Sequence, residues 1–176
     1  MAAARHHSID SIFCSILKAT PQIQTQFPER KIKSMKVNTY LNFPGNCSEA
    51  LDFYTKHLGA KILMKSSFAD MSKFGAPQNM PPGLKPDGIL HARFSLGDTF
   101  VMASDGPKVE PMRSAYVCLA VDSNEEAERI YKVLADGGEV FMAMGEQFFA
   151  HRFGQLRDKF GINWMIIHEK PMPGAH

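Results

Sequence analysis

The stretch VNTYLNFPGNCSEALDFYTKHLGA, residues 37–60, contains a strand-like segment, a turn and a helix in immediate succession. In residues 37–43 polar and apolar side chains alternate, which is the period of a β-strand with two different faces. The following residues carry one face of a helix at i, i+3 and i+7, formed by Leu51, Tyr54 and Leu58. Gly59 then predicts the end of that helix, because glycine readily adopts the left-handed conformation found there.

The same pattern returns in AYVCLAVDSNEEAERIYKVLADGG, residues 115–138. Residues 115–121 read as a strand, and the helical stripe of this second copy consists of Ala127, Ile130, Tyr131 and Leu134. The glycine pair at 137 and 138 predicts the end of the second helix. The chain therefore contains an internal repeat.

Three more strand-like segments follow each copy, at 62–68, 89–96 and 99–104 in the first half and at 139–148, 149–158 and 162–169 in the second. The repeated unit is β-α-β-β-β, and the fold class predicted is α+β. Residues 69–88, with four prolines, interrupt only the first copy and read as a long loop. Whether this loop acts as a lid is left open by the sequence.

A helix covers only one face of the sheet in a β-α-β-β-β unit. We therefore expect the other face of each sheet to be covered by the other copy. Two mixed sheets would then enclose a concave cleft, with the helices on the outside and alternate strand residues lining the interior.

The first 34 residues differ in composition from the rest of the chain. They hold five of the 20 Lys and Arg but only two of the 18 Asp and Glu. We interpret residues 1–34 as a disordered extension, or as the product of a start codon upstream of a true start at Met35. A single domain is expected over 35–176, with module one at 37–104 and module two at 115–169.

The remaining composition narrows the classes of partner. Without the basic extension the chain has no charge excess of the kind that nucleic-acid binding requires, so no nucleic-acid partner is expected. No apolar run approaches the ~20 residues of a membrane-spanning helix. The three cysteines are widely spaced and odd in number, which favours a reducing, cytoplasmic location.

Two motifs carry a family resemblance: the opening YLNFPGNCSEALDFYTKHLGA, residues 40–60, and the closing DKFGINW, residues 158–164. With the repeated β-α-β-β-β unit, the chain resembles the vicinal oxygen chelate (VOC) superfamily, which includes glyoxalase I, bleomycin-resistance proteins and extradiol dioxygenases. It is most similar to the PhnB-like branch, some members of which carry the label 3-demethylubiquinone methyltransferase. The resemblance covers Val37 to Glu169 and implies a homodimer with clefts at or near the subunit interface.

In metal-using members of this superfamily, the first and last strands of each module supply His or Glu ligands. The matching positions here are Asn38 or Thr39, Met102, Tyr116 and Met165. An amide or hydroxyl, two thioethers and a phenol do not supply the ligand field of a divalent ion. We therefore expect no metal and no other cofactor, with a divalent metal held by differently placed ligands as the alternative.

We do not expect this chain to have the methyltransferase activity that the label of some PhnB-like members names. No glycine-rich loop follows a strand and opens a helix in the way that cradles a nucleotide-like cofactor. The predicted sheet is also not doubly wound, so it lacks the switch-point crevice of such folds.

Candidate ligand-binding residues come first from two strands with alternating polar side chains. Asn38, Tyr40 and Asn42 alternate on one strand, and His91 and Arg93 alternate on another. An Arg–His pair in a cleft would hold a carboxylate or a phosphonate. The alternatives are an exposed strand face for the first row and an exposed edge strand for the second.

Apolar lining is expected from the aromatic and sulfur-containing residues of module two and their counterparts. Phe148 and Trp164 are expected to stack on a flat ligand, while the remaining lining would be provided by Met102, Tyr116, Cys118 and Met165.

Glu146 and His151 are the weak catalytic candidates, because a carboxylate and an imidazole together could perform general acid–base chemistry. They lie on successive strands without a third group to orient them. Asp158 lies in a hairpin turn, where an aspartate commonly accepts hydrogen bonds from backbone N–H groups.

The function predicted from these observations is the binding of a small organic molecule in a metal-free cleft, without turnover. The alternative is a metal-dependent, glyoxalase-type lyase or isomerase, or a dioxygenase. A third possibility is a metal-free enzyme built on Glu146 and His151. Binding without turnover predicts that Trp164→Ala weakens ligand binding while His151→Ala has little effect.

Overall fold

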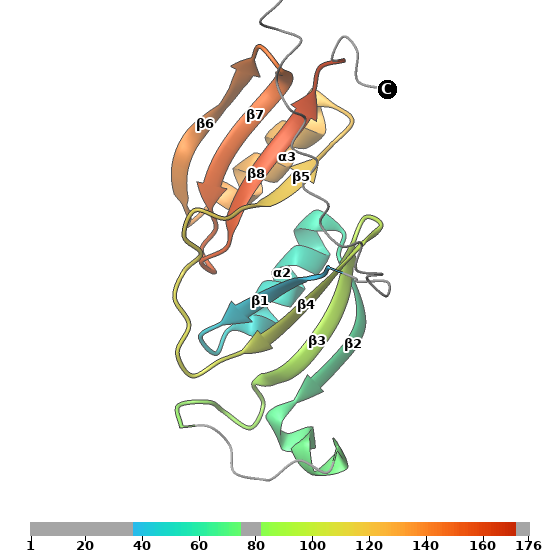
Figure 1. Ribbon diagram of the computed structural model, residues 1–176, viewed down its shortest axis with the longest axis vertical. Coiled ribbons are helices and arrows are strands. Elements are labelled where there is room, and N and C mark those ends of the chain that lie inside the picture. The colour runs from blue at the N-terminus through green and yellow to red at the C-terminus, as the bar shows by residue number, and fades with distance from the viewer. Residues whose placement is uncertain (1–36, 75–81, 172–176) are drawn as a thin grey trace, which may run out of the picture. The chain divides into compact units, whose positions relative to one another are not determined.

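Each half of the chain forms a four-stranded sheet with one helix, in a computed structural model that describes residues 37–74 and 82–171 (Figure 1). Module one contains β1 (Thr39–Phe43), α2 (Cys47–Leu58), β2 (Lys61–Ser67), a 3-10 helix η1 (Phe68–Phe74), β3 (Ile89–Leu96) and β4 (Thr99–Asp105). Module two contains β5 (Val117–Ala120), α3 (Asn124–Ala135), β6 (Glu139–Gln147), β7 (Ala150–Arg157) and β8 (Asn163–Glu169). The predicted α+β class and the repeated β-α-β-β-β order are confirmed, whereas the interpretation of residues 1–34 lies outside the described residues.

The two sheets have the same topology. The strand orders are β1-β4-β3-β2 and β5-β8-β7-β6. In each sheet the first strand of the module pairs in parallel with the last, and the other pairs are antiparallel. Each sheet is therefore mixed and closes only when the last strand of its module is in place.

Strand alternation separates a helix-facing side of sheet one from its other side. Leu41 and Phe43 of β1 are buried, together with Ala92 and Phe94 of β3. They belong to one core cluster with Leu51 of α2. Burial of the Leu and Phe side chains in this set stabilises the fold by roughly 1.5–3 kcal/mol each.

The two modules share that core cluster. Contacts join α2 to α3, and the Tyr54 ring of α2 packs edge-to-face on Trp164 of β8 with centroids 5.5 Å apart. The Tyr54 hydroxyl donates a hydrogen bond of 2.7 Å to Asp158 Oδ2. The modules therefore meet through their helices and the apolar residues beside them.

The opposite faces of the sheets differ from expectation. Tyr40 and Phe100 of sheet one are 43% and 44% exposed, and Phe141 and Met142 of sheet two are 39% and 42% exposed. Among the described residues, neither concave face is covered by the other module of the same chain. Because the chain uses its helix sides to join the modules, the concave faces remain open to solvent.

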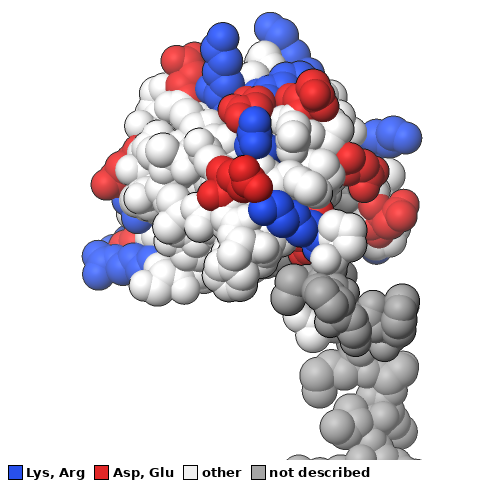
Figure 2. Space-filling model, turned by 90° about the horizontal axis from the view of Figure 1, so that it is seen from above, with Lys and Arg blue, Asp and Glu red and all other residues white. Residues whose placement is uncertain are grey.

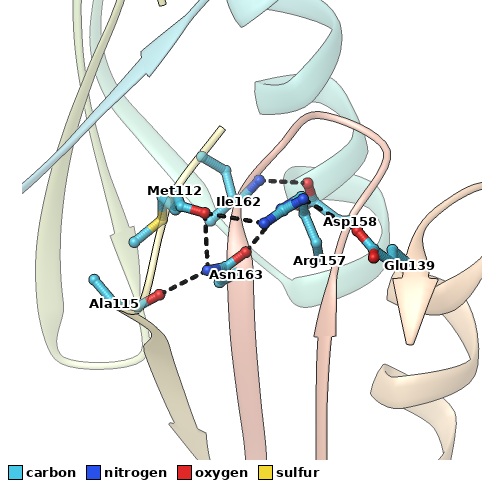
Figure 3. Close-up of polar contacts among 7 residues, drawn as sticks. All are labelled: Met112, Ala115, Glu139, Arg157, Asp158, Ile162 and Asn163. Atoms are coloured by element: carbon cyan, nitrogen blue, oxygen red, sulfur yellow. Dashed lines mark hydrogen bonds and ion pairs between the residues drawn. The ribbon is translucent and has the colours of Figure 1, made fainter. Parts of the chain in front are cut away.

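The segment between the modules is attached to the start of β8 (Figure 3). The Asn163 amide donates hydrogen bonds to the carbonyls of Met112 (3.1 Å) and Ala115 (3.0 Å). The Arg157 guanidinium donates to the same Met112 carbonyl at 3.2 Å. The connection is thus held by buried or half-buried side chains of module two.

The residue range 69–88, predicted as a loop, begins instead within the 3-10 helix η1. Its two ends are joined by backbone hydrogen bonds from Phe68 N to Gly88 O (3.0 Å) and from Ala69 N to Pro86 O (2.9 Å). Residues 75–81 are not described, so the possible lid role lies outside the described structure. Within the described ranges, no helix has the length and apolarity needed to cross a membrane.

Candidate functional site

The concave side of sheet one carries a group of mostly polar side chains, which we call the polar face: Tyr40, Asn42, His91, Arg93, Met102 and Ser104. They belong to β1, β3 and β4, where Tyr40 lies beside Met102 and Asn42 beside Ser104. Arg93 lies on the other side of Met102. Strand alternation directs these side chains away from the core because Leu41, Ala92 and Ala103 between them are buried.

Hydrogen bonds connect the polar face across strands. The Tyr40 hydroxyl oxygen lies 3.2 Å from His91 Nδ1, within hydrogen-bonding distance. The Ser104 hydroxyl donates to Asn42 Oδ1 at 3.1 Å. The Arg93 guanidinium lies over the ring of Phe100, 4.5 Å from its centroid. The face is therefore an organised set of groups.

The edge-strand alternative for His91 and Arg93 is wrong, because β3 lies between β4 and β2 in the sheet. Their predicted facing is correct: His91 is half-buried and Arg93 is exposed, whereas Ala92 and Phe94 between them are buried. The face is exposed in the single chain, as the alternative interpretation of β1 expected. Asn38 lies just before β1 and is exposed.

The donors at the family's metal positions do not fit a divalent ion. The strand register places Tyr40, rather than Asn38, beside Met102, and places Cys118 beside Met165. A phenol, two thioethers and a thiol replace the imidazoles and carboxylates that such an ion prefers. Among residues 37–74 and 82–171, no group of three or more His, Cys, Asp and Glu is arranged to hold a metal ion.

Cys118 does not act as an activated thiolate. Burial and the negative charge of Glu169 raise the pKa of its thiol above the ordinary value. It therefore stays protonated at neutral pH and contributes a small, soft surface to the sheet.

The concave side of sheet two is mainly apolar, and we call Cys118, Phe149, Phe153, Met165 and Ile167 the apolar face. Phe153 and Ile167 form a separate buried cluster, against which Phe149 and Met165 pack. Phe148 lies at the adjoining turn between β6 and β7, is 87% exposed, and packs edge-to-face on Phe149 with centroids 5.0 Å apart. Cys118 therefore lies beside Met165 in the register of β5 and β8, whereas Phe148 lies at the β6–β7 turn, at the end of the sheet where Ala150 pairs with Glu169.

Tyr116 lies just before β5 rather than within it. It is 36% exposed and packs edge-to-face on Phe141 of β6. The guanidinium of Arg157 also lies 5.2 Å from the Phe141 ring centroid. Tyr116 is therefore at the margin of the same sheet face.

Trp164 is not part of a concave face, and its predicted stacking on a ligand is wrong. The side chain is fully buried on the helix side of β8. Its indole N–H donates a 2.7 Å hydrogen bond to Asp158 Oδ2. A Trp164→Ala substitution would therefore act on the stability of the fold, by about 3–5 kcal/mol, instead of removing a ligand contact.

Asp158 has a larger structural role than the predicted turn cap. Its Oδ1 accepts hydrogen bonds from the backbone N–H groups of Phe160 (2.9 Å) and Ile162 (3.0 Å), which confirms the turn role. Its Oδ2 accepts from Tyr54 and Trp164. Burial, followed by the charge of Asp158 and this hydrogen bond, raises the pKa of Tyr54 well above its ordinary value.

Glu146 and His151 do not form an acid–base pair. The Glu146 carboxylate accepts a 2.6 Å hydrogen bond from Lys170, which is the main cause of its lowered pKa. The His151 ring lies beside His168, with centroids 4.9 Å apart. In the described part of the chain the two candidates share no hydrogen bond, so the structure does not bring them together as catalytic groups.

Asp105 is a buried residue of the site region that the sequence did not identify. Its buried carboxylate accepts hydrogen bonds from the backbone N–H groups of Gly45 (3.0 Å), Cys47 (2.9 Å) and Ile89 (2.7 Å). It thereby occupies the N-terminus of α2, where the helix dipole favours a negative charge. No local pattern reveals this contact, because Asp105 is distant from α2 in the sequence.

A small cavity adjoins the polar face, between β1 and the segment joining the modules. It has a volume of about 220 Å³ and includes Tyr40, Asn42, Met112 and Phe160 in its lining. Pockets for organic ligands usually measure about 300–1,000 Å³. This cavity alone is therefore too small to enclose a typical organic ligand.

The fold and the arrangement of the site define the class of protein as one with the VOC fold. A fosfomycin resistance protein FosX from Listeria monocytogenes, solved with Mn(II) and 1S,2S-dihydroxypropylphosphonic acid, shares this fold with a TM-score of 0.55. The match covers 79% of this chain and 95% of that chain at 12% identity, and it shows the fold alone.

More similar proteins define the family. Residues 35–167 match the family model described as 3-demethylubiquinone-9 3-methyltransferase, so the chain belongs to this family, the PhnB-like branch of the VOC superfamily. Protein YjdN of Escherichia coli (strain K12) is 40% identical over 146 residues, which cover 79% of this chain and 99% of YjdN.

Two solved structures extend this comparison. Protein PA1353 from Pseudomonas aeruginosa has 37% identity and a TM-score of 0.66, covering 78% of this chain and all of that one. A PhnB protein from Bacillus cereus, described as a putative 3-demethylubiquinone-9 3-methyltransferase, has 26% identity and a TM-score of 0.63. That match covers 76% of this chain and 99% of the Bacillus chain.

Proposed function

We propose that the protein binds a small organic molecule, without a metal, in a cleft completed by a second copy of the chain. The observation that carries this proposal is the complementary character of the two open concave faces. The polar face offers hydrogen-bonding groups from Tyr40, Asn42 and Arg93, whereas the apolar face offers the partly exposed Met165, packed over the buried Phe153. A ligand between such faces would be oriented by one and desolvated by the other.

A homodimer provides the covering that a single chain lacks. Large apolar side chains are exposed on both concave faces, among them Met64 at 44% and Phe100 at 44% on sheet one and Met142 at 42% on sheet two. Contiguous exposed apolar surface of this kind usually marks an interface. In a twofold dimer the polar face of each subunit would meet the apolar face of its partner, which gives two equivalent clefts.

The methyltransferase activity in the family description is not the function we favour. Strand β1 is followed by a turn with Gly45 and then by α2, the place where a phosphate or nucleotide could approach a helix N-terminus. The N–H groups of Gly45 and Cys47 are already taken there by the Asp105 carboxylate. The mixed sheets also lack the parallel, doubly wound order with its switch-point crevice.

The enzymatic alternatives have weaker support. A glyoxalase-type lyase, isomerase or dioxygenase would need metal ligands that the positions of Met102 and Met165 do not supply. A metal-free enzyme would need Glu146 and His151 to act as a pair, but in the described structure they share no hydrogen bond: Lys170 donates to Glu146, and the His151 ring packs beside His168.

We also propose a cytoplasmic protein without nucleic-acid or membrane partners. Cys47 and Cys118 are free, which suits a reducing compartment. On the face shown in Figure 2, Lys and Arg are interspersed with Asp and Glu, in contrast to a basic patch for nucleic acid.

The proposal is tested by combining metal analysis with a ligand screen on the full chain. We expect less than about a tenth of an equivalent of metal, no rise in melting temperature with Ni, Zn, Mn or Fe(II), and a rise with some organic ligands. Stoichiometric metal that chelators remove, or stabilisation by no organic compound in a chemically broad panel, would contradict it.

A matched pair of hydroxyl deletions then locates the site. Tyr40→Phe removes the hydroxyl that contacts His91 on the polar face, and we expect ligand affinity to fall about three- to tenfold. Tyr131→Phe removes a hydroxyl bound to the Met142 carbonyl from the α3 side, and affinity should remain unchanged. Equal effects of the two variants would place the ligand elsewhere.

A further inference from the structure

We infer that the ligand is an organic carboxylate carried on a flat apolar body, with Arg93 as the residue that selects the carboxylate. This inference rests on the proposed binding function and names the chemical class that the polar face would accept.

The charges on the polar side of sheet one have one sign. Strand register places the cationic Lys61 and Arg93 on this side, together with His91 and uncharged residues of β1 and β4. None of the described strand positions assigned to it is Asp or Glu. The nearest strand carboxylate, Asp105, is buried and already accepts three backbone N–H groups. A ligand on this face therefore meets cationic groups that carry no internal counter-charge.

Arg93 is held in position but left without an anionic partner. Its guanidinium stacks over the ring of Phe100 at 4.5 Å. Within the described residues, no Asp or Glu oxygen lies within 4.0 Å of it, whereas Arg129, Arg152 and Arg157 each pair with a glutamate. Stacking engages the face of the guanidinium and leaves its in-plane N–H donors available, which suits a bidentate carboxylate.

Arg157 of module two is an arginine whose guanidinium donors are occupied by acceptors within the fold (Figure 3). Its donors reach Asn163 Oδ1 at 3.0 Å, Glu139 Oε2 at 3.1 Å and the Met112 carbonyl at 3.2 Å. Arg93 has no comparable set of acceptors in the described structure. The contrast assigns Arg157 to the fold and leaves Arg93 for a ligand.

The neighbours of Arg93 favour an acceptor with an apolar body. The Ser104 hydroxyl donates to the Asn42 carbonyl oxygen and so orients this amide, whose N–H₂ group is a further donor on the polar face. Phe100 and the half-buried Met102, both on the neighbouring strand β4, supply apolar surface next to Arg93. A small inorganic anion would use the donors but leave this apolar surface uncovered.

The test compares two compounds that differ mainly in charge, 2-naphthoate and 2-naphthylmethanol, by isothermal titration calorimetry on the full chain. We expect 2-naphthoate to bind at least tenfold more tightly. Arg93→Gln should reduce its affinity to that of 2-naphthylmethanol, whose own affinity should not change. Lys132→Gln removes an exposed cation of α3 as the matched control and should preserve the preference.

Each opposite result has a distinct meaning. Equal binding of the two compounds, or an unchanged preference in Arg93→Gln, would overturn the carboxylate class. Inorganic phosphate that binds as tightly as 2-naphthoate would overturn the need for an apolar body. If neither compound binds while a neutral or cationic ligand from the screen does, this inference fails and the proposed function stands. If no compound of any class binds, both fail.

Discussion

At the scale of single residues, Asp158 has more buried hydrogen bonds than any catalytic candidate that was named from the sequence. Two backbone N–H groups, the Tyr54 hydroxyl and the Trp164 indole all donate to it. Removing the carboxylate would leave these buried donors unsatisfied, and an unsatisfied buried donor costs more than an ordinary hydrogen bond contributes.

We predict that Asp158→Ala lowers the free energy of unfolding by about 3–5 kcal/mol, measured by urea denaturation. Tyr54→Phe removes only one of the donors and should cost about 1.5–3 kcal/mol. Asp136→Ala changes an exposed aspartate after α3 and should stay within about 0.5 kcal/mol of the parent. An Asp158→Ala protein as stable as Asp136→Ala would show that the carboxylate is dispensable.

The buried thiol of Cys47 makes stability depend on alkaline pH. Burial, reinforced by the charge of Asp105, raises its pKa to about 12, against an ordinary value of 9.0. Between these values the unfolded chain loses this proton while the folded chain keeps it. The stabilising effect is therefore complete below pH 9 and is lost as pH rises towards 12, by up to about 1.4 kcal/mol per pH unit.

We predict that wild-type stability falls more steeply above pH 9 than that of Cys47→Ser, whose hydroxyl does not titrate in this range. The measurement is the free energy of unfolding from pH 7 to pH 11 for both proteins, with reducing agent present. Parallel curves for the two proteins would contradict the prediction, whatever their difference at pH 7.

At the scale of elements, helix α3 packs closely on β7 because Gly154 has no side chain. A Cβ added there would lie 2.7 Å from Cε2 of Tyr131 and 3.3 Å from the Cα of Met144. These are shorter than van der Waals contacts, so either the tyrosine ring or the strand would have to move.

We predict that Gly154→Ala lowers the melting temperature, with a loss of about 1–3 kcal/mol in stability. Gly145→Ala on the neighbouring strand β6 is the matched control, since its added Cβ would meet nothing closer than the Ala143 carbonyl at 4.0 Å. The control should be neutral or slightly stabilising. Similar melting temperatures for the two variants would mean that α3 adjusts without cost.

Strand β3 shows how far strand facing can be predicted from sequence. From Leu90 to Leu96 of this strand, polar and apolar residues alternate, so only one facing buries the apolar set. The structure has that facing, with Ala92 and Phe94 in the core.

Strand β8 shows where the same reasoning fails. In NWMIIHE both faces carry large apolar residues, Trp164 and Ile166 on one and Met165 and Ile167 on the other. Alternation therefore gives no preference between the two facings. The predicted facing of Trp164, towards a ligand in the cleft, is wrong for this reason. In the structure Trp164 packs in the main core cluster and donates to Asp158, and these contacts depend on the tertiary fold.

At the scale of the whole molecule, the repeat and the order of elements could be predicted because helical and strand periodicities are local. The way in which the two modules pack against each other could not be predicted from the sequence. It depends on contacts between residues distant in sequence, such as the hydrogen bond from Arg129 to the His57 carbonyl and that from Tyr54 to Asp158. The open concave faces follow from this docking.

The proposed homodimer gives a prediction at this scale. Met165→Glu would place a carboxylate in the middle of the apolar face, where pairing with a second copy would bury it without a partner. We expect this variant to sediment as a monomer, with its far-ultraviolet circular dichroism unchanged. Lys132→Glu on α3 should sediment like the parent. A parent protein that is itself monomeric at micromolar concentration would contradict the dimer.

The hydrogen bond between Tyr54 and Asp158 also has a consequence for synthesis on the ribosome. The two residues are 104 positions apart, which at ordinary elongation rates is a delay of roughly 5–20 seconds. During that interval helix α2 can form, but its phenol has no acceptor and its apolar stripe lacks the Trp164 ring. We therefore expect the emerging first module to remain loosely packed, and to be recognised by chaperones, until the turn at Asp158 leaves the exit tunnel.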